Sequence, residues 1–122
     1  VCIYSMGNAV SNQRKELMNP ECTTGHTEDG VLFYYTFEKY ADGNVALTGV
    51  DVIPTWVNKY RGGSGYQYTV YPLETASMAE NYGFDAATLS AAKASFERTK
   101  QQVSKGLKEC QQNLGCEVRF AE

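Results

Sequence analysis

Two long β-patterned segments joined by a tight turn constrain this chain more than any other feature of its sequence. Residues 30–40 alternate between two faces, and both faces begin apolar, so we expect this strand to be covered on both sides at its start. Residues 41–44, Ala-Asp-Gly-Asn, predict a hairpin turn because Asp-Gly accepts the positive φ that tight turns require. With a return strand over residues 45–57, the sequence predicts a central β-hairpin.

The return strand contains two irregularities. Its apolar alternation changes phase at Gly49, which predicts a β-bulge, since glycine supplies the unusual backbone geometry of a bulge. Pro54 has no N–H to donate, so we expect that end of the strand to lie at an edge or to leave the sheet. Trp56 is expected to anchor the strand end against the core. A third strand is predicted over residues 66–71, after a glycine-rich connector at 61–65.

Two helices are predicted in the second half of the chain. The first spans about residues 74–82 and ends at Gly83, and Asp85 then caps a long helix by accepting hydrogen bonds from its free amides. An apolar stripe at spacings of three and four predicts that the long helix lies on a sheet or on a partner. The stripe consists of Leu89, Ala92, Phe96, Thr99, Val103, Leu107, Cys110 and Leu114. Gly115 should end the helix, and residues 117–120 are expected to form a last short strand.

The opposite face of the long helix is basic. It carries Lys93, Arg98, Lys100, Lys105 and Lys108. A solvated surface is the simpler interpretation, and contact with an acidic polymer is the alternative. Taken together, these elements predict an α+β fold, in which a small, mostly antiparallel sheet has a long C-terminal helix packed on it.

Length and composition limit the class of protein. The 122 residues suffice for one domain with a modest core. With 43% hydrophobic and 20% charged residues, the composition predicts a chain that is neither disordered nor membrane-spanning. The net charge of −3 makes nucleic acid an unsuitable partner, because nucleic-acid binding depends on neutralising phosphates.

The four cysteines show no spacing typical of a metal site. Cys2, Cys22, Cys110 and Cys116 contain no Cys-x-x-Cys pair, and His26 is the only histidine. If the protein is exported, two disulfides are the better interpretation, and proximity in sequence favours Cys2–Cys22 and Cys110–Cys116. Three connectivities, or four free buried thiols, remain open.

Catalytic motifs are scarce in this chain, and a His-centred triad could use only His26. His26 lies in a loop with Glu28 and Asp29, a combination more typical of plain surface than of a metal site. Gly25-His26-Thr27 resembles the Gly-His-x-His of metallophosphatases, but Glu28 stands where the second histidine should be. The sequence contains no paired-carboxylate motif at a helical spacing inside an apolar cleft, and no Gly-x-Ser-x-Gly elbow. By itself the chain does not have the sequence of a complete enzyme.

The opening segment, Val1–Gln13, has the pattern of a buried strand that runs directly into a Gly-Asn turn. A strand in this arrangement delivers a loop to a site. Because the apolar run begins at the first residue, we expect the chain to be a piece of a larger protein.

Several stretches resemble one family. Tyr4-Ser5-Met6-Gly7-Asn8, followed by Asn12-Gln13, is similar to the Tyr-Ser-Leu-Gly-Asn-Phe…Asp-Gln stretch of the CapA-type capsule and poly-γ-glutamate synthesis proteins. The resemblance continues through Asp29–Phe33 and Val50–Val57 and ends near Leu73. It covers about residues 1–73, and the two helices after it match nothing in the family.

The resemblance implies a fragment of a metallophosphatase-like α/β sandwich. Residues 1–73 would be the C-terminal sheet portion, and residues 74–122 a helical extension packed on it as a single structural unit. The family's metal-ligand motifs would all precede the first residue, so no catalytic residue or metal ligand is assigned within this chain. A divalent metal is expected only in the full-length protein. Ser5, Gly7 and Asn8 would line the site, where the Asn8 amide offers both a donor and an acceptor. Ala9 replaces the family's usual aromatic, which leaves that pocket wall unassigned.

The resemblance also implies a location and a role. The parent would be an extracellular protein of a Gram-positive-type envelope, held to the membrane only through an N-terminal anchor outside this chain, and it would make or anchor an anionic polymer. A catalytic parent would be a metallophosphatase-like hydrolase. The alternative is a non-catalytic polymer-binding module or a structural subunit of an envelope synthesis complex. Expected partners are the remainder of the parent protein or a second copy, and an anionic capsule polymer.

Overall fold

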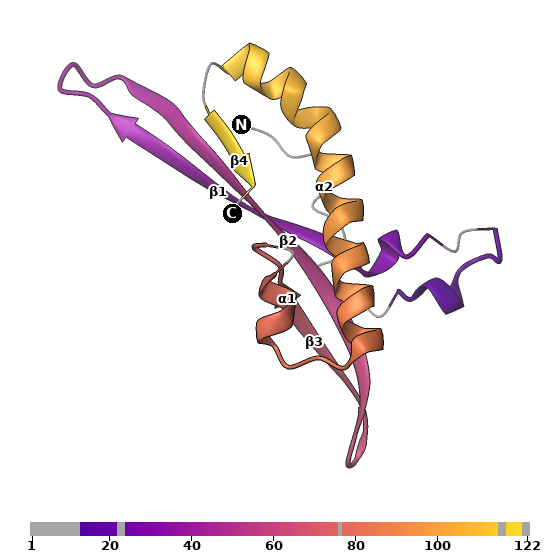
Figure 1. The fold of residues 1–122 in the computed structure, drawn as a ribbon. Helices are drawn as coiled ribbons and strands as arrows, with labels where there is room; N and C mark the ends of the chain where they lie inside the picture. Colours follow the sequence, from indigo (N-terminus) through magenta and orange to yellow (C-terminus); the bar gives the residue numbers. More distant parts are fainter. Residues whose placement is uncertain (1–12, 22–23, 76, 115–116, 121–122) are drawn as a thin grey trace.

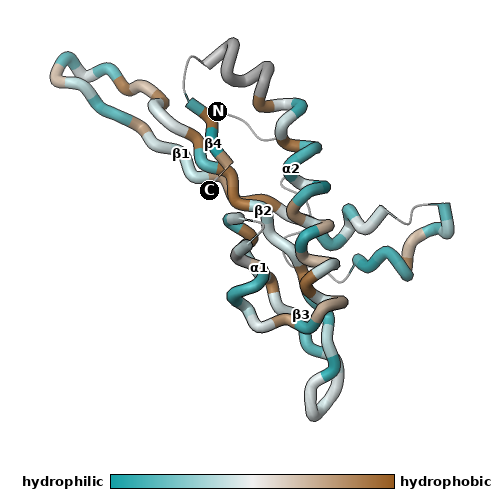
Figure 2. The backbone as a smooth tube through the Cα atoms, in the orientation of Figure 1, coloured by the Kyte–Doolittle hydropathy of each residue, from teal (hydrophilic) through white to brown (hydrophobic). Residues whose placement is uncertain are grey.

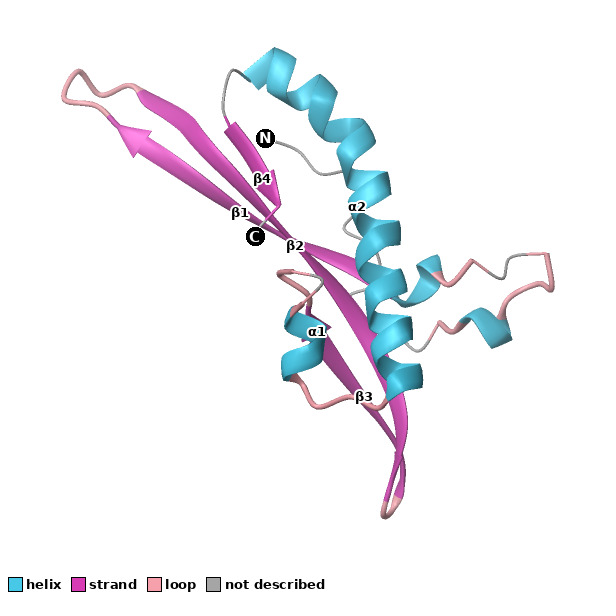
Figure 3. Ribbon diagram, in the orientation of Figure 1, coloured by secondary structure: helices cyan, strands magenta, loops and turns pink. Residues whose placement is uncertain are grey.

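The computed structural model describes residues 13–21, 24–75, 77–114 and 117–120, apart from the side chains of residues 78 and 108–114. Its elements, in chain order, are two short 3₁₀ turns at Lys15–Leu17 and His26–Glu28, then β1 (Asp29–Lys39), β2 (Val45–Gly62), β3 (Gly65–Pro72), α1 (Met78–Asn81), α2 (Ala86–Leu114) and β4 (Glu117–Phe120). The fold is α+β, with one sheet and one long helix (Figure 3). This confirms the predicted class.

β2 is the central strand of a four-stranded, mostly antiparallel sheet. β1 pairs antiparallel with it along one edge, from Lys39 opposite Val45 to Asp29 opposite Trp56. The other edge of β2 has two partners, placed end to end. β4 pairs in parallel with residues 49–52, and β3 pairs antiparallel with residues 55–62. The turns of the two hairpins therefore point away from each other, as Figure 1 shows.

α2 packs along one face of the sheet and joins two hydrophobic clusters. The Trp56 cluster consists of Trp56, Leu73, Ala79, Ala92 and Phe96. The Val52 cluster consists of buried Val50 and Val52, against which Val103 and Leu107 of α2 pack. Figure 2 shows the resulting hydrophobic stretch in the middle of β2. Ala92, Phe96 and Thr99 of the predicted stripe are buried, and so is Ser95, which the stripe does not include.

The prediction that β1 is covered on both faces at its start is wrong. Val31, Phe33 and Tyr35 face the Val52 cluster. On the other face Leu32 is 46% and Tyr34 57% exposed. The helices pack on one face of the sheet, so the apolar residues of β1 on the opposite face lie in solvent.

The prediction for Pro54 is also wrong. Pro54 is fully buried within β2, opposite Val31 of β1, and the strand continues to Gly62. The Pro54 carbonyl accepts a 2.7 Å hydrogen bond from the backbone N–H of Leu73, which directly follows β3. The Pro54 nitrogen therefore also faces the edge of β2 along which β3 and β4 pair. That point of the edge falls between the pairing of β4, which ends at Val52, and that of β3, which begins at Thr55. A missing N–H breaks no ladder there.

The bulge and the first hairpin turn are confirmed. Thr36 pairs with Gly49 and Phe37 with Leu47, so Thr48 is the extra residue of the bulge. Its hydroxyl donates to the Thr36 carbonyl at 3.2 Å. At the turn, the Asn44 N–H donates to Asp42 Oδ1 at 3.0 Å, an Asx-type contact that favours reversal.

The helix boundaries agree in part with the sequence. The first helix is shorter than predicted, Met78–Asn81 instead of about 74–82. Gly83 follows it with a φ of 69°, as expected for a C-terminal stop. Asp85 caps α2 by accepting a 2.7 Å hydrogen bond from the Thr88 N–H. β4 is present where a last strand was predicted. In the described part of the chain no helix has the length and apolar character to span a membrane.

Candidate functional site

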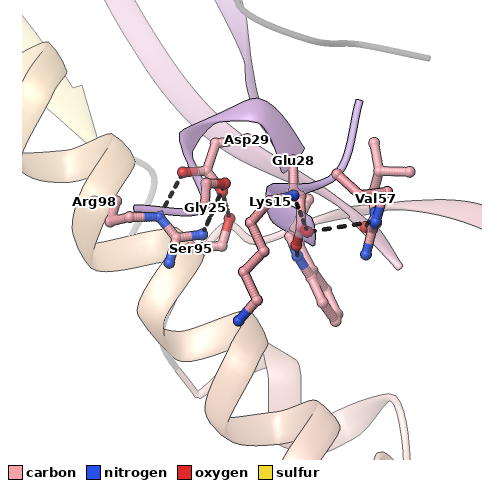
Figure 4. Close-up of polar contacts among 9 residues, drawn as sticks. Lys15, Gly25, Glu28, Asp29, Val57, Ser95 and Arg98 are labelled. Atoms are coloured by element: carbon pink, nitrogen blue, oxygen red, sulfur yellow. Dashed lines mark hydrogen bonds and ion pairs between the residues drawn. The ribbon is translucent and has the colours of Figure 1, made fainter. Parts of the chain in front are cut away.

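The first residue of β1 is a buried carboxylate held by α2 (Figure 4). Asp29 Oδ1 accepts a 2.6 Å hydrogen bond from Ser95 Oγ. Nε and Nη2 of Arg98 donate to the two Asp29 oxygens, each at 2.7 Å. This two-point pairing is the strong geometry for a guanidinium and a carboxylate. It connects the start of the sheet to the middle of the long helix.

A second buried carboxylate lies next to the first. Glu28 Oε1 is 3.3 Å from Arg14 Nε, an ion-pair distance without the alignment of a hydrogen bond. Its other oxygen accepts a 3.5 Å hydrogen bond from Trp56 Nε1. Arg14 donates from Nη1 to the Val57 carbonyl at 2.6 Å. The side chains of Arg14 and Glu28 are only 7% and 9% exposed, so each charge depends on the other for compensation.

Gly25 allows the loop before β1 to approach these charges. It has a φ of 82°, and a Cβ at this position would lie 3.1 Å from Cζ of Arg98. Its carbonyl accepts a 3.4 Å hydrogen bond from Arg98 Nη2. The glycine therefore serves both a left-handed turn and a close contact with the guanidinium.

A pocket of about 310 Å³ opens between this loop and the first half of α2. Its described lining consists of Lys15, Thr24, Gly25, Glu28, Ala87, Ser90, Ala91, Ala94 and Arg98. The small side chains of α2 leave the space, and the loop supplies most of the polar groups. In Figure 4 the Lys15 side chain extends from the loop toward α2.

The charges around the pocket favour an anionic ligand. Arg14 forms an ion pair with Glu28, and Arg98 forms an ion pair with Asp29. Within the described residues Lys15 has no ion-pair partner, and Nη1 of Arg98 has no hydrogen-bond partner. Together with the hydroxyls of Thr24 and Ser90, these donors suit a carboxylate or a phosphate. Glu28, the carboxylate among the described lining residues, is already engaged with Arg14 and Trp56, so the described lining offers donors for binding an anion.

The structure corrects the interpretation of the loop before β1. Glu28 and Asp29 were read as surface carboxylates, and both are buried. Arg98 was placed on a solvated helix face, and it is paired with Asp29. His26 is exposed and takes part in neither the Arg14–Glu28 nor the Arg98–Asp29 ion pair, in agreement with its interpretation as a surface residue. Ser5, Gly7 and Asn8, the proposed site-lining residues, lie outside the described residues, as do the cysteine side chains of the Cys2–Cys22 and Cys110–Cys116 pairings.

One sequence signal points to the missed contacts. Ser95 and Arg98 are one helical turn apart, and Ser95 lies between the stripe residues Ala92 and Thr99. A hydroxyl within an apolar stripe needs a hydrogen-bond partner once it is buried, and a cation one turn away can supply the counter-charge of a buried carboxylate. The sequence does not say which carboxylate, because the contact joins segments far apart in the chain.

Among the residues that the structure describes, no group of three or more His, Cys, Asp or Glu side chains is arranged to hold a metal ion. Comparison with protein-family models, with curated proteins and with solved structures gave no match to this chain. The residue-level resemblance and the site geometry therefore carry the functional argument.

Proposed function

We propose that this chain is the C-terminal portion of a CapA-type protein of the cell surface, which makes or anchors a capsule or poly-γ-glutamate polymer. Its sheet would complete a metallophosphatase-like α/β sandwich. The proposal starts from the motif segments Tyr4–Asn8, Asp29–Phe33 and Val50–Val57. The last two belong to the described fold and support the proposal through their roles in it.

One observation carries the proposal. The two described motif segments form neighbouring strands in register, with Asp29 opposite Trp56 and Phe33 opposite Val52. Val52 and Trp56 are buried members of the two hydrophobic clusters, and Asp29 is a buried residue that accepts a hydrogen bond from α2. The residues on which the resemblance depends are thus residues on which the fold depends.

In this proposal the pocket next to β1 recognises an anionic group of the polymer. Lys15 and the free edge of Arg98 supply the positive charge, and Thr24 and Ser90 supply further donors. The metal ligands of a hydrolase would lie in the part of the parent that precedes this chain. Catalysis, if the parent has it, would combine the two parts.

Deletion of the gene in its source organism tests the proposal. We expect the cell-bound anionic polymer to fall, and an intact copy of the gene to restore it. A copy with Lys15→Gln should restore less polymer, whereas the matched control Lys39→Gln, in the exposed hairpin away from the pocket, should restore it fully. An unchanged amount of polymer in the deletion strain would overturn the proposal.

A second measurement separates the hydrolase from its non-catalytic alternative. The native protein is purified from the organism, and hydrolysis of bis-p-nitrophenyl phosphate is measured with and without added Mn²⁺. Metal-dependent hydrolysis identifies the parent as a phosphoesterase. Loss of polymer in the deletion strain without any hydrolysis by the purified protein identifies a polymer-binding or structural subunit.

A further inference from the structure

The β2–β3 hairpin differs in charge from the rest of the molecule. The chain as a whole has a net charge of −3, yet residues 52–73 contain no Asp or Glu. The same stretch contains Lys59, Arg61 and four of the nine tyrosines. Figure 1 shows that the hairpin projects beyond α1 and α2, with its turn at the far end.

The strand register places two of its cations and two of its rings on one face. Lys59 lies directly opposite Tyr68, and Arg61 directly opposite Tyr66. Directly opposite residues of an antiparallel pair share a face, and so do residues two apart along a strand. The Lys59 ammonium lies 4.5 Å from the centroid of the Tyr66 ring, which agrees with this arrangement. We call these four residues the hairpin patch.

The rings of the hairpin patch are open to solvent. Tyr66 is 62% and Tyr68 45% exposed, and Val70 continues the same face with 39% of its surface exposed. In the described part of the chain, neither Lys59 nor Arg61 forms an ion pair. The patch therefore combines accessible apolar rings with unneutralised positive charge, at a spacing of about 7 Å along each strand.

We infer that the hairpin patch binds an acidic polysaccharide. A sugar ring has an apolar face that stacks on a tyrosine ring, and the carboxylates of a polyuronate pair with Lys and Arg. The repeating sugar rings and repeating charges of one polymer match the two tyrosines on β3 and the two cations on β2. This surface lies apart from the pocket next to β1, and the inference goes beyond the proposed function because it stands on the hairpin alone.

Two other partners fit the patch less well. Insertion into a membrane requires apolar side chains at the hairpin tip, and the tip is Gly62-Gly63-Ser64-Gly65. Nucleic-acid binding rests on many phosphate contacts, and this patch has two cations on a chain of net negative charge. The positive charge of the hairpin patch and its aromatic rings together favour a polyuronate over a membrane or a nucleic acid.

Binding to three polymers by isothermal titration calorimetry tests the inference. Polygalacturonate offers rings and charge, dextran offers rings alone, and polyglutamate offers charge alone. We expect the protein to bind polygalacturonate at least about tenfold more tightly than either of the others, since both kinds of contact contribute. Binding is compared in the Lys15→Gln variant, because the pocket next to β1 is itself proposed to bind an anionic polymer. Equally tight binding of polyglutamate and polygalacturonate to this variant would show that the tyrosine rings contribute nothing, and would overturn the inference.

Variants connect the binding to the patch. Tyr66→Thr with Tyr68→Thr keeps strand propensity and should weaken binding about tenfold, whereas Tyr66→Phe with Tyr68→Phe should retain it. Lys59→Gln with Arg61→Gln should weaken binding and reduce its dependence on salt. Far-UV circular dichroism confirms that each variant is folded.

The other hairpin provides the matched control. Lys39 and Tyr40 are also an exposed cation and ring, but Tyr40 donates to Glu38 at 3.2 Å and Asp42 lies in the same turn. Lys39→Gln with Tyr40→Thr should therefore leave binding unchanged. Three results would overturn the inference: equal losses in both hairpins, binding to anionic lipid vesicles but not to polygalacturonate, or patch variants that change only the oligomeric state measured by light scattering.

Discussion

Asp29 is the residue at which the loop, the sheet and the long helix meet. Its side chain is 8% exposed and accepts from both Ser95 and Arg98. Asp29→Asn removes the charge and leaves Arg98 without its counter-ion, so we expect a loss of about 2–3 kcal/mol in the free energy of unfolding. Urea denaturation followed by circular dichroism measures it.

Asp51 is the matched control for Asp29. It forms an ion pair of 3.4 Å with Arg119, and both side chains are substantially exposed. Solvent screens such a pair, so Asp51→Asn should cost less than about 1 kcal/mol. Equal losses for the two variants would mean that the Asp29 pair does not hold α2 to the sheet.

Asp85 gives α2 a dependence on pH. Its pKa is lowered, mainly by the hydrogen bond from the Thr88 backbone N–H. A carboxylate with a lowered folded pKa contributes stability above its unfolded pKa, about 3.9 for Asp, and loses it as the pH falls through the folded pKa. An asparagine at this position can still accept the capping hydrogen bond at the start of α2, but its side chain does not titrate. We expect the melting temperature of Asp85→Asn to fall less than that of the wild type between pH 5 and pH 2. Parallel curves for the two proteins would contradict this.

The candidate site shows what residue patterns leave undetermined. The cap at Asp85 is local, because donor and acceptor are three residues apart, and the sequence predicted it. The burial of Glu28 and Asp29 is not local. It depends on Arg14 and on Ser95 and Arg98, which tertiary contacts bring together. A carboxylate next to a histidine in a loop looks the same in sequence whether or not a distant cation covers it.

At the scale of elements, two glycines near or within the helices should respond to alanine in opposite directions. Gly106 is an exposed residue of α2, and a Cβ at this position would meet nothing within 4 Å. Gly106→Ala should stabilise the protein by up to about 1 kcal/mol through helix propensity. Gly83 has a φ of 69° after α1, so Gly83→Ala should destabilise by about 1 kcal/mol. Thermal denaturation of both variants measures these changes in stability. A lower melting temperature for Gly106→Ala would show that α2 needs flexibility at that position.

The elements themselves were largely readable from the sequence, since turn chemistry and side-chain period are local. The Asp-Gly turn, the bulge next to Gly49 and the long helix follow from such patterns. Pro54 was misplaced for a non-local reason. A proline breaks a central strand only where a partner requires its N–H, and here the gap between β4 and β3 removes that requirement. The exposure of Leu32 and Tyr34 likewise depends on which face α2 covers.

At the scale of the whole molecule, one strand and one helix pass through both hydrophobic clusters. β2 contributes Val50 and Val52 to one and Trp56 to the other, while α2 contributes residues to both. The N-terminal half of α2 is also fixed by the Asp29 pair. Because the same central strand and the same long helix run through both clusters, the two should not unfold separately.

Val52→Ala tests this coupling. Val52 is fully buried in one cluster, and the only tryptophan, Trp56, reports on the other. Removing the buried methyl groups should cost about 2 kcal/mol. Because β2 and α2 connect the clusters, Trp56 fluorescence and far-UV circular dichroism should shift together along the urea axis. Val45→Ala, at a position of the same strand that is 60% exposed, should shift neither curve appreciably. If the variant lost ellipticity while the Trp56 signal kept its wild-type midpoint, the Val52 cluster would be an independent unit that opens while the Trp56 cluster stays closed.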